Sequence, residues 1–273
     1  MHPTFNPAAV RRSLYEAGVT RFPAVPTMLD ALGRLAGPRE RPPTLRTVCS
    51  AGSPLPARVA AAFQARFAIA PRQIYGVSEL GSVAISAEGD ELGCVGRPLP
   101  GVAVRILDRN SLNSEKPLAT GQEGVVGIAT PSRFDGYLDG CVERAPYFVT
   151  GDLGHLDARG ALWLNGRVSL LIDVGAAKVN PLEVEALLMR HPSVREAVVL
   201  PLAFAATVAR MRAIVVPEPG ASITTEELRR FARQHLIDFK VPRVFEVREQ
   251  VPRSPSGKIM RRELARMLEA GDS

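Results

Sequence analysis

Apolar residues in the first 90 positions alternate between helix-like and strand-like spacing. In TMLDALGRLA, the residues Met28, Leu29 and Leu32 recur at helical spacing. PLPARVAAAFQARF shows the same periodicity through Val59 and Phe63. LRTVCSAG and RQIYG are short apolar runs that end in glycine, as buried strands often do. This alternation predicts an α/β fold with a mainly parallel sheet.

The pattern changes twice further along the chain. GVAVRILD, EGVVGIAT, YFVTGD and ALWLNG are short β-rich runs bounded by Gly, Asp and Asn, which predict an antiparallel sheet or small barrel. After Arg167, strand-like LLIDVG, VREAVVL and MRAIVVP alternate with helix-like NPLEVEALLMRH and TEELRRFARQHL. Thr224 or Thr225 is expected to cap the last of these helices, with Glu227 in a capping box. We therefore expect a domain boundary near Arg167.

Composition narrows the protein class. The 273 residues include 46% hydrophobic and 23% charged residues, typical of a globular protein with a substantial core. The net charge of +6 comes from scattered basic residues, a pattern that does not indicate a nucleic-acid surface. Cys49, Cys94 and Cys141 form no C-x-x-C pair, so we expect buried free thiols rather than zinc or disulfides. Without an apolar leader or a run of about 18 apolar residues, we expect a soluble cytoplasmic protein.

Four longer motifs follow one another along the chain. They are QIYGVSELGS, YFVTGDLGHLDARGALWLNGR, GRVSLLIDVGAAKVNPLEVE and VPRSPSGKIMRREL. This ordered set resembles the signatures of the adenylate-forming superfamily, which includes acyl-CoA synthetases, luciferases and adenylation domains of peptide synthetases. Weaker likeness extends back to VPTMLDAL, so the resemblance covers nearly the whole chain.

The resemblance implies a fold and a reaction. Residues 1–167 are expected to be the C-terminal part of the large AMP-binding domain, an incomplete domain with a mostly parallel sheet and a β-rich subdomain. Residues 168–273 are expected to be the small, mobile α+β C-terminal domain. The implied ligase activates a carboxylic acid with ATP as acyl-AMP. It then passes the acyl group to a thiol of coenzyme A or a carrier protein after the small domain rotates.

Lys258 is the expected catalytic residue. It follows Gly257, which allows a tight backbone turn close to a ligand. A compact ammonium suits a phosphate or carboxylate oxygen. From the residues alone, a solvated loop lysine is the simpler interpretation. The resemblance implies instead that Lys258 bridges the substrate carboxylate and the α-phosphate and stabilises the charge that develops during adenylation.

Asp152 and Arg167 are expected to contact the ribose. A carboxylate that accepts two hydrogen bonds suits a ribose diol, and the resemblance gives Asp152 this role. Arg167 would be a second ribose contact, at the hinge between the domains. From the residues alone, a turn aspartate is the simpler interpretation of Gly151-Asp152.

The other expected nucleotide contacts lie earlier in the chain. By resemblance, Tyr75 would stack on the adenine, Gly76 would admit it, and Gly52 would let the backbone approach it. Ser78 would present a hydroxyl to phosphate. Glu79 would have a catalytic role by helping to hold Mg²⁺, a hard ion that prefers oxygen ligands. A core aromatic at position 75 and a strand-to-helix turn at position 52 remain the plain alternatives.

One signature of the superfamily is absent. We find no loop rich in Ser, Thr and Gly with a closing lysine, whose backbone N–H groups would cradle the β- and γ-phosphates. Three expectations follow: a fragment of a complete enzyme, a split subunit completed by a partner that carries the loop, or a non-catalytic binding protein. An uncovered sheet edge would also favour a partner or a homo-oligomer.

Overall fold

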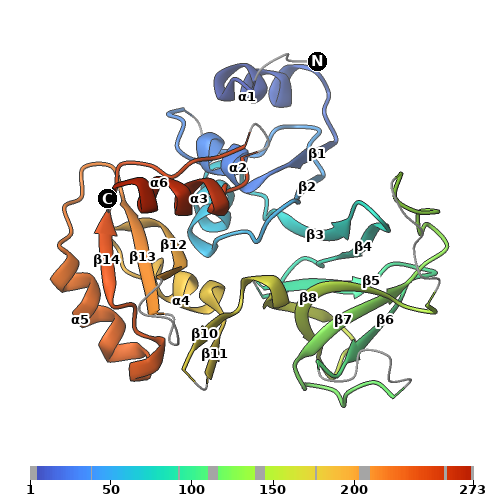
Figure 1. The fold of residues 1–273 in the computed structure, drawn as a ribbon. Helices are drawn as coiled ribbons and strands as arrows, with labels where there is room; N and C mark the ends of the chain where they lie inside the picture. The colour runs from blue at the N-terminus through green and yellow to red at the C-terminus, as the bar shows by residue number, and fades with distance from the viewer. Residues whose placement is uncertain are drawn as a thin grey trace. The chain divides into compact units, whose positions relative to one another are not determined.

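The computed structural model describes residues 5–37, 39–91, 93–109, 116–138, 145–175, 177–202, 210–254 and 257–271. The chain divides into two compact units, 1–164 and 165–273, and each is described by itself (Figure 1). The residue pattern predicts a boundary after Arg167. That the second part moves as a domain stays a prediction.

The described part of the first unit is built on one nine-stranded sheet with the order β1-β2-β3-β4-β5-β9-β8-β7-β6. Strands β1, β2 and β3 pair in parallel, and the pairs β3–β4, β4–β5, β5–β9, β6–β7 and β7–β8 are antiparallel. The predicted α/β class is confirmed, and the runs expected to form an antiparallel sheet or barrel continue the same sheet. The strands are β1 (Arg21–Ala24), β2 (Thr47–Ser50), β3 (Arg72–Val77), β4 (Gly81–Ile85), β5 (Cys94–Pro98), β6 (Ala103–Leu107), β7 (Gly124–Ala129), β8 (Phe148–Leu156) and β9 (Leu162–Arg167).

Three helices pack against the parallel strands. They are α1 (Pro7–Glu16), α2 (Pro26–Gly33) and α3 (Ala57–Phe67). Their shared core includes Leu14 of α1, Leu29 of α2 and Phe63 of α3, which pack in one cluster with Val48 of β2. The three helices bury their apolar faces in one cluster against the parallel strands. This core supports the loops that follow those strands.

The turn between β8 and β9 is organised by Asp157. One carboxylate oxygen accepts hydrogen bonds from the N–H groups of Arg159 at 2.8 Å and Ala161 at 2.9 Å. The other accepts from the indole N–H of Trp163 at 3.3 Å. These hydrogen bonds, first the one from the Ala161 backbone, lower the pKa of Asp157 from 3.8 to about 2.

The ionised Asp157 should therefore stabilise the folded turn at neutral pH but not in acid. Because its pKa is lower when folded than when unfolded, the stabilisation is present above about pH 4 and is lost as the pH falls through about 2. We expect Asp157→Asn to be less stable than wild type at about pH 5, with the difference much smaller near pH 2. Urea unfolding followed by fluorescence of Trp163, the single tryptophan, measures this. An equal difference at both pH values would contradict it.

The described part of the second unit holds a two-stranded and a three-stranded sheet. The first pairs β10 with β11, and the second has the order β12-β13-β14, with β12–β13 antiparallel and β13–β14 parallel. The elements are η1 (Val168–Leu170), β10 (Ile172–Val174), β11 (Ala177–Val179), α4 (Pro181–Leu188), β12 (Val194–Leu202), β13 (Arg210–Pro217), α5 (Thr225–His235), η2 (Asp238–Lys240), β14 (Val244–Val247) and α6 (Arg261–Gly271).

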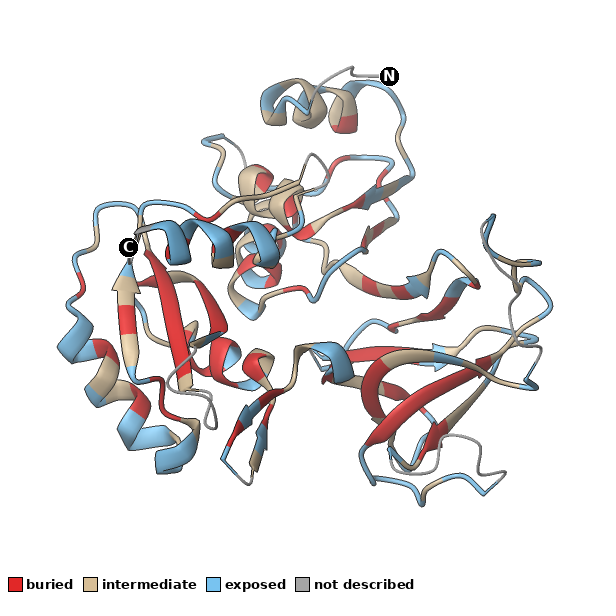
Figure 2. Cartoon of the chain, viewed as in Figure 1, coloured by how far each residue is buried: buried red, intermediate tan, exposed pale blue. Residues whose placement is uncertain are grey.

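Helices cover both faces of the three-stranded sheet. Val199 and Ala213 point to the cluster that contains residues of α4 and α5, whereas Val198 and Ile214 point to the cluster that contains Leu264 of α6. Figure 2 shows the resulting concentration of buried residues on β12 and β13 and the exposed outer faces of α5 and α6. A sheet buried on both faces needs apolar residues at consecutive positions, which explains the unbroken runs AVVL and AIVV.

Two helices of this unit begin at side-chain caps. The Thr224 hydroxyl accepts a hydrogen bond from the Glu227 N–H at 3.2 Å, and the Glu227 carboxylate accepts from the Thr224 N–H at 2.8 Å. The predicted capping box is confirmed, with Thr224 rather than Thr225 as the cap. The Asn180 side chain likewise caps α4 by accepting from the Leu182 N–H at 3.1 Å.

A buried ion pair closes the open edge of β12. The Glu185 carboxylate of α4 accepts from both terminal nitrogens of Arg261, at 2.7 and 2.6 Å. The same carboxylate accepts from the Val199 N–H at 2.7 Å, and Arg261 donates to the Val199 carbonyl at 3.2 Å. Because β12 is the first strand of its sheet, the two side chains satisfy backbone groups that have no neighbouring strand.

The remaining global expectations concern cysteines and membranes. Cys94 is buried and Cys49 half-buried, and both are free thiols. The prediction for Cys141 lies outside the described residues. Within the described ranges, none of the helices combines the length and the apolar character that a membrane crossing requires.

Candidate active site

The β3–β4 hairpin presents the side chains of Ser78 and Glu79. The Leu80 N–H donates to the Val77 carbonyl at 3.0 Å and closes a four-residue turn, with Ser78 and Glu79 at its two central positions. Gly81 follows with φ +72°, the left-handed residue that a hairpin loop of this length requires. Ser78 is exposed and Glu79 half-buried, and both lie in the turn at the tip of the hairpin.

Two of the expected site glycines have local structural reasons. A Cβ atom at Gly76 would lie 2.4 Å from the Gly81 carbonyl oxygen, so the hairpin itself requires glycine there. Gly52 follows β2 and has φ +88°, which favours glycine over residues with a side chain. The chain turns at Gly52 on its way from β2 to α3, as the plain alternative predicts. Neither observation tests contact with a nucleotide.

A local distortion of β8 directs the Asp152 side chain. Gly151 has φ +73°, and the β7–β8 ladder shifts register opposite this segment. The Thr150 hydroxyl accepts from the Asp152 N–H at 3.1 Å and donates to the Val126 carbonyl at 3.0 Å. Irregularities of this kind re-aim side chains and are frequent next to functional sites. The T-G-D motif thus encodes a fixed backbone shape as well as a carboxylate.

The structure joins two of the sequence motifs through one hydrogen bond. The Tyr75 hydroxyl donates to Oδ2 of Asp152 at 2.6 Å, across 77 residues of sequence. Both residues are 7% exposed. The Tyr75 ring packs in the core with Val83 and Ala84, as the plain alternative predicts. Its hydroxyl holds a carboxylate oxygen at a distance typical of a charge-assisted hydrogen bond.

Glu79 is held by a residue that the sequence motifs do not include. The Tyr137 hydroxyl donates to Oε1 of Glu79 at 2.9 Å, and the Phe134 N–H donates to the Glu79 carbonyl at 2.8 Å. This bond to Glu79 is the main cause that raises the pKa of Tyr137. In the sequence, Tyr137 is marked only by its place in FDGYLDG, a stretch rich in Gly and Asp.

The acidic residues fit a shared metal site rather than a closed one. Across the described ranges, no group of three or more His, Cys, Asp or Glu residues forms a metal site. Mg²⁺ is commonly held by one or two carboxylates together with substrate phosphates. A single carboxylate such as that of Glu79 is compatible with a metal ion held mainly by substrate phosphates.

The other expected site residues belong to the second unit. Arg167 ends β9 and is exposed immediately before η1. Lys258 is also exposed, and its ammonium has no hydrogen-bond or ion-pair partner among the described residues of this unit. Gly257, directly before it, has φ +80°. The backbone therefore makes the tight turn that the sequence predicts at Gly257-Lys258.

Within the first unit, the expected site residues gather at neighbouring strand ends. Gly52 follows the carboxyl end of β2, and Tyr75 and Gly76 lie at the carboxyl end of β3, its parallel neighbour. The tyrosine hydroxyl connects this edge to Asp152. In open α/β sheets, ligands bind outside the carboxyl ends of the strands. At this edge of the sheet, one buried carboxylate is held by a tyrosine hydroxyl.

Two family models match most of this chain. The family model for AMP-binding enzymes matches residues 1–138, and the model for the AMP-binding enzyme C-terminal domain matches residues 183–258. The fatty acid–[acyl-carrier-protein] ligase ScoC of Streptomyces coeruleorubidus is 32% identical over 91% of this chain and 50% of its own length. The chain spans about half the length of the curated relatives it matches.

Two solved structures share the fold. ATP-bound MatB from Rhodopseudomonas palustris superposes with a TM-score of 0.88 at 26% identity, covering 98% of this chain and 54% of that one. The o-succinylbenzoate CoA synthetase of Bacillus subtilis, in complex with its acyl-adenylate intermediate, gives 0.81 at 26% identity, covering 96% and 54%. With more than half of its residues matched by the family model, this chain belongs to the AMP-binding enzyme family.

Proposed function

We propose that this chain takes part in the ATP-dependent activation of a carboxylic acid and in its transfer to a thiol. In the first step the carboxylate attacks the α-phosphorus of ATP, which gives acyl-AMP and pyrophosphate. In the second, a thiol of coenzyme A or a carrier protein attacks the acyl carbonyl and AMP leaves. The observation that carries this proposal is the hydrogen bond between Tyr75 and Asp152, which links two family motifs at one strand edge.

In this proposal the first unit binds the nucleotide. The Asp152 carboxylate accepts hydrogen bonds from the ribose hydroxyls, and Tyr75 fixes its orientation. Gly52 and Gly76 allow the adenine to approach the backbone, with the Tyr75 ring against it. Because Tyr75 is only 7% exposed, only a small part of its surface would be available to the adenine.

The β3–β4 hairpin would serve the phosphate groups. The exposed Ser78 hydroxyl would donate to a phosphate oxygen. Glu79 would supply one oxygen ligand to Mg²⁺, with phosphate oxygens supplying others. When bound, the ion would neutralise charge on the phosphates. Tyr137 would keep the Glu79 carboxylate in place through its hydroxyl.

The second unit would supply the charged groups of the reaction. Lys258 is assigned to the substrate carboxylate and the α-phosphate, where its positive charge stabilises the transition state. Arg167 is assigned to the ribose. For the thiol step, we propose that the second unit rotates near Arg167, which withdraws Lys258 and exchanges one half-reaction for the other.

Asp152→Ala should weaken AMP binding about 10- to 100-fold, because a hydrogen bond to a charged group contributes about 1.5–3 kcal/mol. Tyr75→Phe should have a smaller effect, about 3- to 10-fold, because it removes only the group that orients the carboxylate. Isothermal titration of AMP into the full chain measures both. Glu16→Ala, an exposed charge change on α1, is the control for net charge. Wild-type affinity in a folded Asp152→Ala variant would reject the ribose assignment.

A further inference from the structure

The segment that carries Lys258 is a small hairpin with an internal ladder. The Met260 N–H donates to the Pro252 carbonyl at 2.9 Å, and the Ser254 N–H donates to the Lys258 carbonyl at 2.9 Å. The Gly257 N–H donates to the Ser254 carbonyl at 2.8 Å. The ladder holds the backbone on either side of Lys258 but leaves its side chain exposed.

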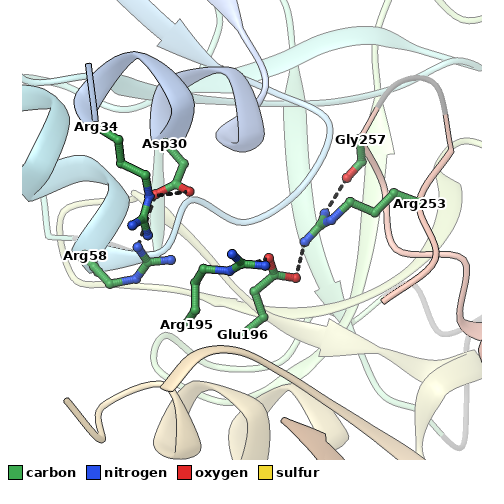
Figure 3. Close-up of polar contacts among 7 residues, drawn as sticks. All are labelled: Asp30, Arg34, Arg58, Arg195, Glu196, Arg253 and Gly257. Atoms are coloured by element: carbon green, nitrogen blue, oxygen red, sulfur yellow. Dashed lines mark hydrogen bonds and ion pairs between the residues drawn. The ribbon is translucent and has the colours of Figure 1, made fainter. Parts of the chain in front are cut away.

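One arginine connects this hairpin to the sheet of the second unit. One terminal nitrogen of Arg253 donates to the Gly257 carbonyl at 2.6 Å, and the other donates to the Glu196 carboxylate of β12 (Figure 3). Arg195 pairs with the other oxygen of Glu196 at 3.3 Å. The Arg253 and Glu196 side chains are 29% and 20% exposed, so solvent only partly screens the contact. Gly257, whose carbonyl accepts the hydrogen bond from Arg253, directly precedes Lys258 in the sequence.

From this arrangement we infer that Arg253 is a positioning residue for Lys258, with Glu196 as its anchor on β12. The planar guanidinium holds a carbonyl and a carboxylate at once, a geometry that a lysine point charge does not reproduce. By holding the Gly257 carbonyl, Arg253 fixes the backbone position from which the Lys258 side chain extends. The inference rests on the proposed role of Lys258, because it explains how an exposed ammonium on a small hairpin is kept in one place.

The ion pair of Arg261 and Glu185 has a different place and role. It lies after the hairpin, at the start of α6, and satisfies the edge of β12. Its loss should affect the whole unit, whereas the loss of Arg253 should affect the hairpin alone. A local effect is therefore the property that distinguishes a positioning residue from a purely structural one.

Hydrogen exchange of the full chain tests the inference directly. In Arg253→Met, the amides of Gly257, Lys258 and Met260 should exchange roughly 10- to 100-fold faster than in wild type, because a charge-assisted contact that closes the hairpin is lost. The denaturation midpoint should stay unchanged. Glu196→Gln should show the same change to a smaller extent. Arg262→Met, an exposed arginine on α6, is the matched control and should leave these amides unaffected.

Steady-state kinetics of adenylation give a second measurement. Arg253→Met should lower kcat roughly 10- to 100-fold, as expected for a misplaced catalytic group, without changing the AMP Kd. Arg253→Lys should restore part of the rate. The inference is overturned if Arg253→Met leaves hydrogen exchange of the hairpin amides unchanged. It is also overturned if hydrogen exchange rises across the whole second unit. If wild type lacks adenylation activity both alone and with a partner that supplies a phosphate loop, the proposed function fails, and hydrogen exchange alone decides the role of Arg253.

Discussion

Replacing Glu185 by alanine is expected to destabilise the second unit by about 3–5 kcal/mol, the usual cost of removing one partner of a buried ion pair. Glu185 is 5% exposed, and its removal leaves the Arg261 guanidinium without its counter-charge. It also leaves the Val199 N–H without an acceptor. The guanidinium and the N–H group would either stay buried without this partner or become hydrated. Hydration would require α6 to separate from β12.

Chemical denaturation followed by circular dichroism, with hydrogen exchange of peptides from β12 and α6, measures this loss. Glu183→Ala on the same helix is the matched control. Glu183 forms a more exposed pair with Lys240, so its loss should cost at most about 1 kcal/mol. Similar losses for the two variants would contradict the assigned role of Glu185.

A double variant separates the stability gained from the Glu185–Arg261 ion pair from the stability lost by burying its charges. Burial raises the pKa of Glu185, and the Arg261 charge opposes that rise. The cost of desolvating the carboxylate is therefore not fully offset by the pair. Glu185→Leu combined with Arg261→Met should be closer in stability to wild type than either single alanine variant, since apolar replacements of buried pairs are often near neutral. A loss equal to the sum of the single losses would show that the two residues act independently.

Lys258→Ala is expected to reduce the rate of acyl-adenylate formation about 100- to 1,000-fold, the typical effect of removing one group that stabilises developing charge. AMP should still bind, because the proposed ribose contact at Asp152 lies in the first unit and is retained. Lys258→Arg should recover little, since a broad guanidinium does not replace a compact ammonium. Pyrophosphate–ATP exchange across a panel of carboxylic acids measures the rate.

The same assay separates the proposed enzyme from its alternatives. Exchange by the full chain that is lost in Lys258→Ala supports the ligase, with Lys240→Ala as the control for loss of a lysine. Exchange only after addition of a partner that supplies a phosphate loop supports a split subunit. AMP binding with no exchange under either condition supports a non-catalytic binding protein. Undiminished exchange in Lys258→Ala would refute the assignment of the catalytic lysine.

Elements whose own residues carry a complete signal are predictable from the sequence. Thr224 and Glu227 mark the start of α5, and the paired apolar runs of β12 and β13 mark a buried sheet. In contrast, α1 and β1 carry weak signals. Only Leu14 is buried in α1, and β1 is a four-residue strand that contains Pro23. Their formation depends on the surrounding core, which local pattern does not reveal.

The candidate site divides in the same way. Motifs locate Tyr75 and Asp152 separately, but their hydrogen bond spans 77 residues and depends on the strand order and on the shifted ladder at β8. The pair Glu185 and Arg261 is separated by 76 residues and is likewise invisible to local reasoning. Each pair joins two different sequence motifs. Such motifs therefore record partners in the folded chain as well as contacts with a ligand.

The contact between Tyr75 and Asp152 also bears on the thermodynamics of ligand capture. Two side chains that the fold has already immobilised lose little rotamer freedom when a ligand arrives. An unsupported carboxylate would have to surrender that freedom at the moment of association. In the proposed function, the folded chain would therefore offer the sugar a preorganised acceptor, so that preference for a diol is built into the protein before any nucleotide binds.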